Sequence, residues 1–312
     1  MMKNSRRLRI RSSRLIALAL TVTLAAGCHL VSPGDPARGG LPNLSAPTFG
    51  GLQLWADVAW SDDWRVQRHV WSGHHRLLDP DDIRRAWGSE AYCVSLLPVE
   101  EEKHLVILLH GLGRTRFSFE ELEERLEADG YRVASLAYPS TRAPLDQHAA
   151  SVEHVLDRLV EVDRVSFVTH SLGGRVVLRL LEREGEWMDR IDLGRVVQIA
   201  PPNRGSRLAA QFARVPMVTC LLGPSFLQVS LPSTEEPPSY LQLGVIAGVR
   251  GAPGGWNPLL PEDDDGVVAL SETRPDFPHD HLQVTGFHTF LMAHDEVLAA
   301  TSRFLEQGRF EL

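Results

Sequence analysis

One serine of this chain stands at a junction that could make it a nucleophile. Ser171 follows the apolar run Val165–Val168 and precedes an amphipathic helix pattern over Arg175–Leu181. A strand that turns sharply into a helix strains the backbone of such a serine and lifts its hydroxyl clear of the sheet. The next amide, that of Leu172, then lies at a helix N-terminus, where it can stabilise a developing negative charge. The chemistry that this arrangement favours is acyl transfer through a serine nucleophile.

The tight turn needs small residues two positions to either side of the serine. Gly173 meets that need, but Thr169 stands where the first glycine of the G-x-S-x-G pattern usually lies. Taken alone, Ser171 could equally belong to an ordinary strand-to-helix turn. Residues elsewhere in the chain therefore have to decide between the two interpretations.

A second motif supplies a candidate oxyanion loop. The near-continuous apolar run Lys103–Leu109 predicts a parallel strand buried on both faces. It ends in His110–Gly113, where two glycines let the backbone bend back over the sheet. We expect the amide of Leu112 to be the second oxyanion donor, beside that of Leu172. His110 and His170 are interpreted as residues that shape their turns without titrating.

The candidate acid and base follow in the order Ser, Asp, His, which is the chain order of the α/β-hydrolases. The acidic run Asp263–Asp265 leads into apolar residues, and His288 directly follows the strand-like segment Leu282–Thr285. Another member of the acidic run could serve as the acid, and His294, where the last helix pattern begins, is a rival base. Calcium at Asp263 or Asp264 is an alternative, but a solvated acidic turn is favoured, and no metal or cofactor is predicted.

Four motifs in matching chain order resemble the signatures of α/β-hydrolases of the bacterial lipase and esterase kind. The resemblance runs from about Glu102 to the C-terminus and rests on four segments: His110–Gly113, Thr169–Gly174, Pro201–Ser206 and Asp265–Val268.

The resemblance implies a residue for each catalytic role. It implies Ser171 as nucleophile, Asp265 as acid and His288 as base, with the Leu112 and Leu172 amides as oxyanion donors. Asp265 is preferred within its run because it adjoins Gly266, as in the matching family motif.

The composition of the N-terminal segment predicts an export signal. Residues 1–27 hold six basic residues, no acid and the apolar run Leu15–Ala26, which is typical of a signal peptide. The run ends before Cys28, in a sequence that resembles the lipobox of bacterial lipoproteins, and cleavage nearby without lipidation is the alternative. Residues 28–50 carry four prolines and are predicted as a flexible tether. We therefore expect an exported protein of the cell envelope, anchored to the membrane through Cys28.

Charge and cysteine content fit that location. The chain has a net charge of −8, and loss of the six basic residues of 1–27 leaves −14. A chain this acidic is not expected to bind nucleic acid. Besides Cys28 it has Cys93 and Cys220, for which a disulfide and two free thiols both stay open.

The remaining residues, 51–312, are predicted as one catalytic domain with a doubly wound, mostly parallel sheet. Five of the seven tryptophans fall between residues 51 and 99, where packing on the sheet is favoured over an aromatic surface. Ser118 and Glu121 suggest a capping box. An apolar cap insert is expected at about 203–240, either holding an acyl chain or packing on the domain.

The function that these patterns predict is hydrolysis of carboxylic esters, lipids among them, through an acyl-enzyme on the serine. An acyltransferase would use the same three residues and pass the acyl group to an acceptor other than water. An envelope lipoprotein that kept the fold and lost the activity is disfavoured, because all three residue types and the glycine-rich loop are present.

Overall fold

The computed structural model describes residues 93–96, 104–138, 140–141, 143–159 and 162–311. The predicted signal peptide, Cys28, the tether and the segment with five tryptophans lie outside the described residues. Nothing in the structure therefore bears on the predictions for residues 1–92.

The core of the fold is a seven-stranded sheet with the order β1-β3-β2-β4-β5-β6-β7. Neighbouring strands run parallel from β3 to β7, whereas β1 pairs antiparallel with β3 at one edge. The strands are β1 (Cys93–Leu96), β2 (His104–Leu109), β3 (Arg132–Ala137), β4 (Arg164–His170), β5 (Asp192–Ile199), β6 (Gln242–Val249) and β7 (Asp280–Thr285). The predicted parallel sheet is confirmed.

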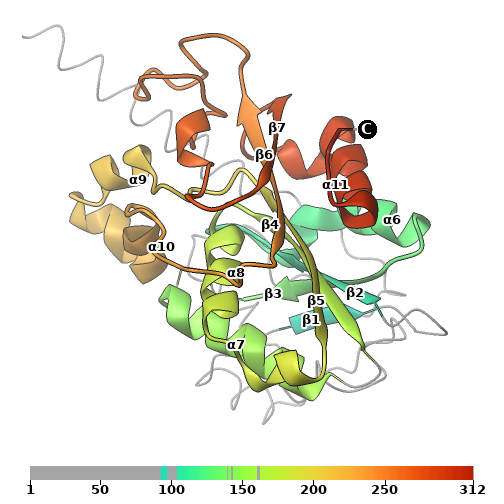
Figure 1. The fold of residues 1–312 in the computed structure, drawn as a ribbon. Helices are drawn as coiled ribbons and strands as arrows, with labels where there is room; N and C mark the ends of the chain where they lie inside the picture. The colour runs from blue at the N-terminus through green and yellow to red at the C-terminus, as the bar shows by residue number, and fades with distance from the viewer. Residues whose placement is uncertain (1–92, 97–103, 139, 142, 160–161, 312) are drawn as a thin grey trace, which may run out of the picture.

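Helices cover both faces of this sheet (Figure 1). α7 (Leu145–Arg158) and α8 (Leu172–Glu182) pack on one face, and α6 (Glu120–Ala128) and α11 (Asp295–Gln307) pack on the other. Short 3₁₀ turns are η2 (Arg116–Phe119), η3 (Glu186–Asp189), η4 (Leu270–Glu272) and η5 (Leu291–Ala293). The central strands read as apolar runs because both of their faces are buried.

The predicted capping box before α6 is wrong. Ser118 lies inside η2, and α6 begins at Glu120 with Phe119 as its N-cap and no side-chain cap. The Ser118 hydroxyl instead accepts a hydrogen bond from Nε of Arg114, 3.3 Å away. A side chain four residues earlier, Arg114, therefore binds the hydroxyl that the sequence pattern assigned to the helix end.

Between β5 and β6 the chain forms two helices, α9 (Arg207–Phe212) and α10 (Pro216–Val229), which lie together beside α8 (Figure 1). α10 is kinked at Gly223, whose φ of 76° is open to glycine at little cost. A Cβ there would lie 1.8 Å from the carbonyl oxygen of Thr141, so the kink packs α10 closely on the loop after β3.

The apolar residues of this insert divide into two groups. Val218, Phe226 and Val229 are buried in the same core cluster as α7 and α8. Others are exposed, namely Val215, Met217, Leu221 and Leu227. One side of the insert thus packs on the domain, and the other presents exposed apolar side chains. Cys220, on α10, carries a free and exposed thiol rather than a disulfide. Within the part of the chain that the structure describes, no helix is long and apolar enough to span a membrane.

Candidate active site

The backbone of Ser171 is held in the strained turn expected of a nucleophile. Its φ is 51° and its ψ is −116°, values that a residue other than glycine rarely adopts. The turn is fixed by a hydrogen bond from the Ser171 amide to the carbonyl of Ile199, at 2.9 Å. Gly173 must be small, because a Cβ there would lie 2.3 Å from the carbonyl oxygen of Leu109.

The threonine that departs from the usual pattern is accommodated in the sheet. Thr169 is fully buried, and its hydroxyl donates to the carbonyl of Val197 on β5, 3.3 Å away. The polar group of the side chain thus has a partner, as a buried hydroxyl requires.

The glycine-rich loop after β2 packs directly on this turn. A Cβ on Gly111 would lie 2.8 Å from Nδ1 of His170 and 3.2 Å from Cβ of Ser171. Only glycine fits at such a distance, so the loop's backbone reaches the serine closely. The sequence alone suggested the bend, and the structure gives the contact that requires it.

His110 sets the direction of the next peptide in that loop. The Gly111 carbonyl accepts from Nδ1–H of His110 at 2.9 Å and from the Arg114 amide at 3.2 Å. Because the peptide bond is trans, the Leu112 N–H points opposite to that carbonyl. Burial lowers the pKa of His110 to about 4, so the ring stays neutral near pH 7. His110 therefore shapes the loop without titrating near neutral pH, as the sequence suggested.

The two amides expected to bind an oxyanion, those of Leu112 and Leu172, are available. Within the described residues neither amide donates a hydrogen bond to another group of the chain. The Leu172 amide opens α8, where the first N–H groups of a helix have no intrahelical acceptor. Two unused donors thus flank the serine on the loop and helix sides.

Asp265 and His288 form the closest acid–base pair of the site. Nδ1 of His288 donates to Oδ2 of Asp265 at 2.7 Å, and both side chains are buried. The second carboxyl oxygen accepts from the Val267 and Val268 amides, at 2.9 and 2.7 Å. The His288 amide also donates to the Asp265 carbonyl at 2.8 Å. Both oxygens of the Asp265 carboxyl thus have hydrogen-bond partners, whereas Nε2 of His288 has none among the described residues.

The neighbouring acids serve the loop instead. Asp263 accepts from the amides of Arg250, Gly251 and Ala252. Asp264 accepts from the amides of the loop at Trp256 and Asn257 and from that of Gly266.

These contacts separate Asp265 from the rest of the acidic run, since it alone reaches a histidine. Among the described residues no cluster of three potential ligands for a metal ion occurs.

Among the described residues His294 makes no hydrogen bond to the acidic run. It is the N-cap of α11, and its Nδ1 accepts from the Glu296 amide at 3.3 Å. Within the described chain the Ser171 hydroxyl has no hydrogen-bond partner, so the structure does not join it directly to either histidine. Such bonds are often long before a substrate is bound.

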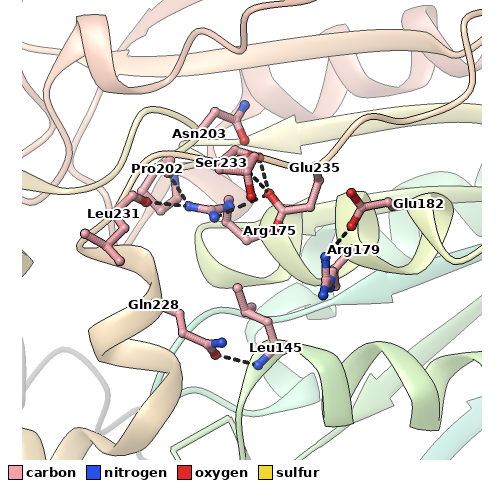
Figure 2. Close-up of polar contacts among 12 residues, drawn as sticks. Leu145, Arg175, Arg179, Glu182, Pro202, Asn203, Gln228, Leu231, Ser233 and Glu235 are labelled. Atoms are coloured by element: carbon pink, nitrogen blue, oxygen red, sulfur yellow. Dashed lines mark hydrogen bonds and ion pairs between the residues drawn. The ribbon is translucent and has the colours of Figure 1, made fainter.

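Sequence reasoning missed a buried ion pair that ties the end of the cap to the helix after the serine (Figure 2). The Arg175 guanidinium lies 3.4 Å from the Glu235 carboxylate, with about 5% of either side chain exposed. It also donates to the carbonyls of Pro202 and Leu231. Arg175 stands one turn after Ser171, so the cap's return loop is attached beside the nucleophile. No local signal pairs two residues so far apart in the chain.

Comparison with known proteins places this arrangement in a family. The model of the alpha/beta hydrolase family matches residues 106–305. The mature form of the lipase BlEst2 from Bacillus licheniformis superposes with a TM-score of 0.51 at 17% identity, covering 64% of this chain and 92% of that one. The propeptide form gives a TM-score of 0.53 at 15% identity, covering 64% and 50%. A search of curated proteins found no match.

The chain therefore belongs to the alpha/beta hydrolase family. The predicted α/β-hydrolase fold is confirmed by the sheet, the flanking helices and these matches. Family membership supports a hydrolase in general terms, while likeness at such low identity shows the fold alone.

Proposed function

We propose that this protein hydrolyses carboxylic esters through a covalent acyl-enzyme. The observation that carries the proposal is the buried Asp265–His288 hydrogen bond of 2.7 Å, on a loop tied to the strained turn at Ser171. Nucleophile, base and orienting acid are the parts that serine hydrolases share across unrelated folds.

In the proposed reaction Nε2 of His288 takes the Ser171 proton while Oγ attacks the ester carbonyl. The carbonyl oxygen becomes negatively charged, and the Leu112 and Leu172 amides stabilise that charge. Asp265 holds His288 in the Nδ1–H form and stabilises the imidazolium. His288 then protonates the leaving alcohol, and water, activated by the same histidine, releases the acid.

We propose uncharged esters with an apolar acyl group as the substrate class. Support comes from the cap, because Phe212 and Leu222 pack against the same core cluster as Leu112, the proposed oxyanion donor. The cap also carries exposed apolar side chains, namely Val215, Met217, Leu221 and Leu227. Backbone amides suit any acyl carbonyl, so the cap rather than the catalytic residues would select the acyl group.

A series of p-nitrophenyl esters tests this function. We expect kcat/KM to rise from acetyl toward medium-length acyl groups and then level off when the site is full. Each methylene buried would contribute about 0.8 kcal/mol, or roughly fourfold. A flat series, or cleavage of peptides faster than esters, would contradict an acyl site on the cap. No ester hydrolysis at all would contradict the proposed function.

Two alternatives remain beside hydrolysis. An acyltransferase would give a new ester or amide when an alcohol or amine acceptor is added, which product analysis detects. A protein without activity would not react with a fluorophosphonate, a probe that labels activated serines.

We also propose that Cys28 carries a lipid anchor after export and removal of residues 1–27. Its support is the sequence alone: a basic segment, an apolar run and the lipobox-like residues before the cysteine. Such an anchor would hold the hydrolase at a membrane of the cell envelope, with residues 28–50 as a spacer.

Labelled palmitate tests the anchor in cells that make the protein. We expect incorporation into the wild-type chain and none into Cys28→Ser. Cys220→Ser is the matched control, because Cys220 is the exposed free thiol of the described residues, and it should keep the label. Equal labelling of wild type and Cys28→Ser, or loss of label from Cys220→Ser alone, would refute an anchor at Cys28.

A further inference from the structure

Two successive carbonyls in the loop of His288 accept hydrogen bonds from buried side chains of other parts of the site. Nε2 of His170 lies 3.0 Å from the His288 carbonyl oxygen. The guanidinium of Arg114 donates to the Thr289 carbonyl at 2.9 Å. His170 directly precedes Ser171, and Arg114 directly follows the glycine-rich loop. The loop of the histidine is thereby attached to both the nucleophile turn and the oxyanion loop.

We propose that His170 is a positioning residue which, together with Arg114, holds His288 in register with Ser171. The proposal rests on the proposed function, since it concerns the alignment of the base with the nucleophile. His170 itself would touch neither substrate nor reacting atoms, because its ring donates to a backbone carbonyl.

The partners of His170 define its tautomer. A carbonyl oxygen only accepts, so Nε2 must carry the proton and Nδ1 the lone pair. Nδ1 is buried against Gly111 and has no hydrogen-bond partner among the described residues. His170 therefore has a single ring N–H, on Nε2, and that N–H donates to the His288 carbonyl.

Burial, with the nearby His288 and Arg114 adding to it, holds the pKa of His170 well below its usual value. The ring is thus neutral beside the base, whose centroid lies 4.6 Å away. A charged His170 would oppose the imidazolium that His288 forms in the proposed reaction. A neutral donor can hold the loop without that penalty.

The hydrogen bond from His170 completes the restraints on His288. The His288 amide and Nδ1 are both held by Asp265, and the carbonyl is held by His170. His288 lies in a turn, outside helices and strands, so these bonds rather than a regular ladder set its position. Of its hydrogen-bonding atoms only Nε2 has no partner among the described residues, which is what a general base requires.

Two amide variants test whether the donor must reach as far as Nε2 does. Both side chains are polar donors, but they differ in length. In His170→Gln the side-chain nitrogen can occupy the place of Nε2, whereas in His170→Asn the same amide ends one bond short. His170→Leu keeps an apolar body and removes the donor. Purified full-length variants are compared with wild type on one p-nitrophenyl ester.

We expect His170→Gln to keep kcat within about threefold of wild type. His170→Asn and His170→Leu should lose roughly 10- to 100-fold in kcat with KM changed by less than about twofold, because misalignment affects the reacting step and not substrate binding. The matched control is His104→Leu, which removes a histidine hydrogen bond to Ser166 at the opposite end of the sheet and should leave kcat unchanged.

A spectroscopic signal tests the same idea without turnover. The proton shared by His288 and Asp265 should give a low-field NMR resonance in wild type and His170→Gln, shifted or broadened in His170→Asn. Wild-type kcat and an unshifted resonance in both His170→Asn and His170→Leu would overturn the proposal. Equal losses in the glutamine and asparagine variants would also overturn it.

The test also distinguishes the two hypotheses. Absence of ester hydrolysis by wild type would contradict the proposed function, while the resonance would still report on positioning. If His170→Leu does not fold, the glutamine and asparagine pair decides alone.

Discussion

Replacing Ser171 by alanine is expected to lower kcat for a short p-nitrophenyl ester by about 10⁴- to 10⁶-fold, the loss seen when the nucleophile of a serine hydrolase is removed. The physical reason is that no other group would form the acyl-enzyme, and only binding and the oxyanion amides would remain. Labelling by a fluorophosphonate should disappear in the same variant.

The variant should still fold, which makes the result interpretable. The Ser171 hydroxyl has no hydrogen-bond partner within the described chain, and alanine keeps the Cβ that the turn already accommodates. We expect the free energy of unfolding to change by less than about 0.5 kcal/mol, measured by denaturant titration. Ser302→Ala, which removes a hydroxyl on α11 far from the serine in the chain, is the control and should keep full activity. A folded Ser171→Ala protein with near wild-type hydrolysis would exclude Ser171 as the nucleophile.

The parallel sheet could be predicted from sequence because its strands are buried on both faces. Runs such as Leu105–Leu109 contain only apolar residues, and each ends in a recognisable turn. The edge strand β1 was not predicted, since four residues carry too little pattern. The capping box at Ser118 failed for a different reason: Ser118 lies inside the 3₁₀ turn η2, and its hydroxyl binds Arg114, four residues earlier.

The acidic run shows where sequence reasoning on the site reaches its limit. Asp263, Asp264 and Asp265 are chemically identical, and the preference for Asp265 came from resemblance to a family motif. In the structure the three carboxyl groups differ in the hydrogen-bond partners that lie 7 to 23 residues away in the chain. Local sequence does not encode which carboxyl meets backbone amides and which meets an imidazole, because folding of the loop decides it.

The buried basic residues extend the same argument. The sequence predicts that His110 and His170 shape their turns, and in the structure each donates to a backbone carbonyl. Their acceptors, however, differ in reach: one is the next residue and the other lies 118 residues away. Arg114 and Arg175 also donate hydrogen bonds to backbone carbonyls that lie far away in the chain. A sequence pattern identifies the motif that contains such a residue. It does not identify the segment whose backbone carbonyl the residue binds.

Replacing His288 by alanine is expected to lower kcat by at least about 10⁴-fold, whereas His294→Ala should keep activity within about threefold. The expectation follows from partners: His288 donates to the buried Asp265 carboxyl, and His294 caps α11. Without His288 no group would take the Ser171 proton. Activity on a short p-nitrophenyl ester and the melting temperature are measured for both variants.

The stability of the two variants provides an independent check on these roles. His294→Ala should cost no more than about 1 kcal/mol, the value of a helix cap, and His294→Asp should restore it. His288→Ala leaves one oxygen of Asp265 without its partner and should cost about 1 to 3 kcal/mol. The opposite pattern of activity, with His294→Ala inactive and His288→Ala active, would make His294 the base. The Asp265–His288 bond would then serve only to hold its loop, and the proposed mechanism would have to be abandoned.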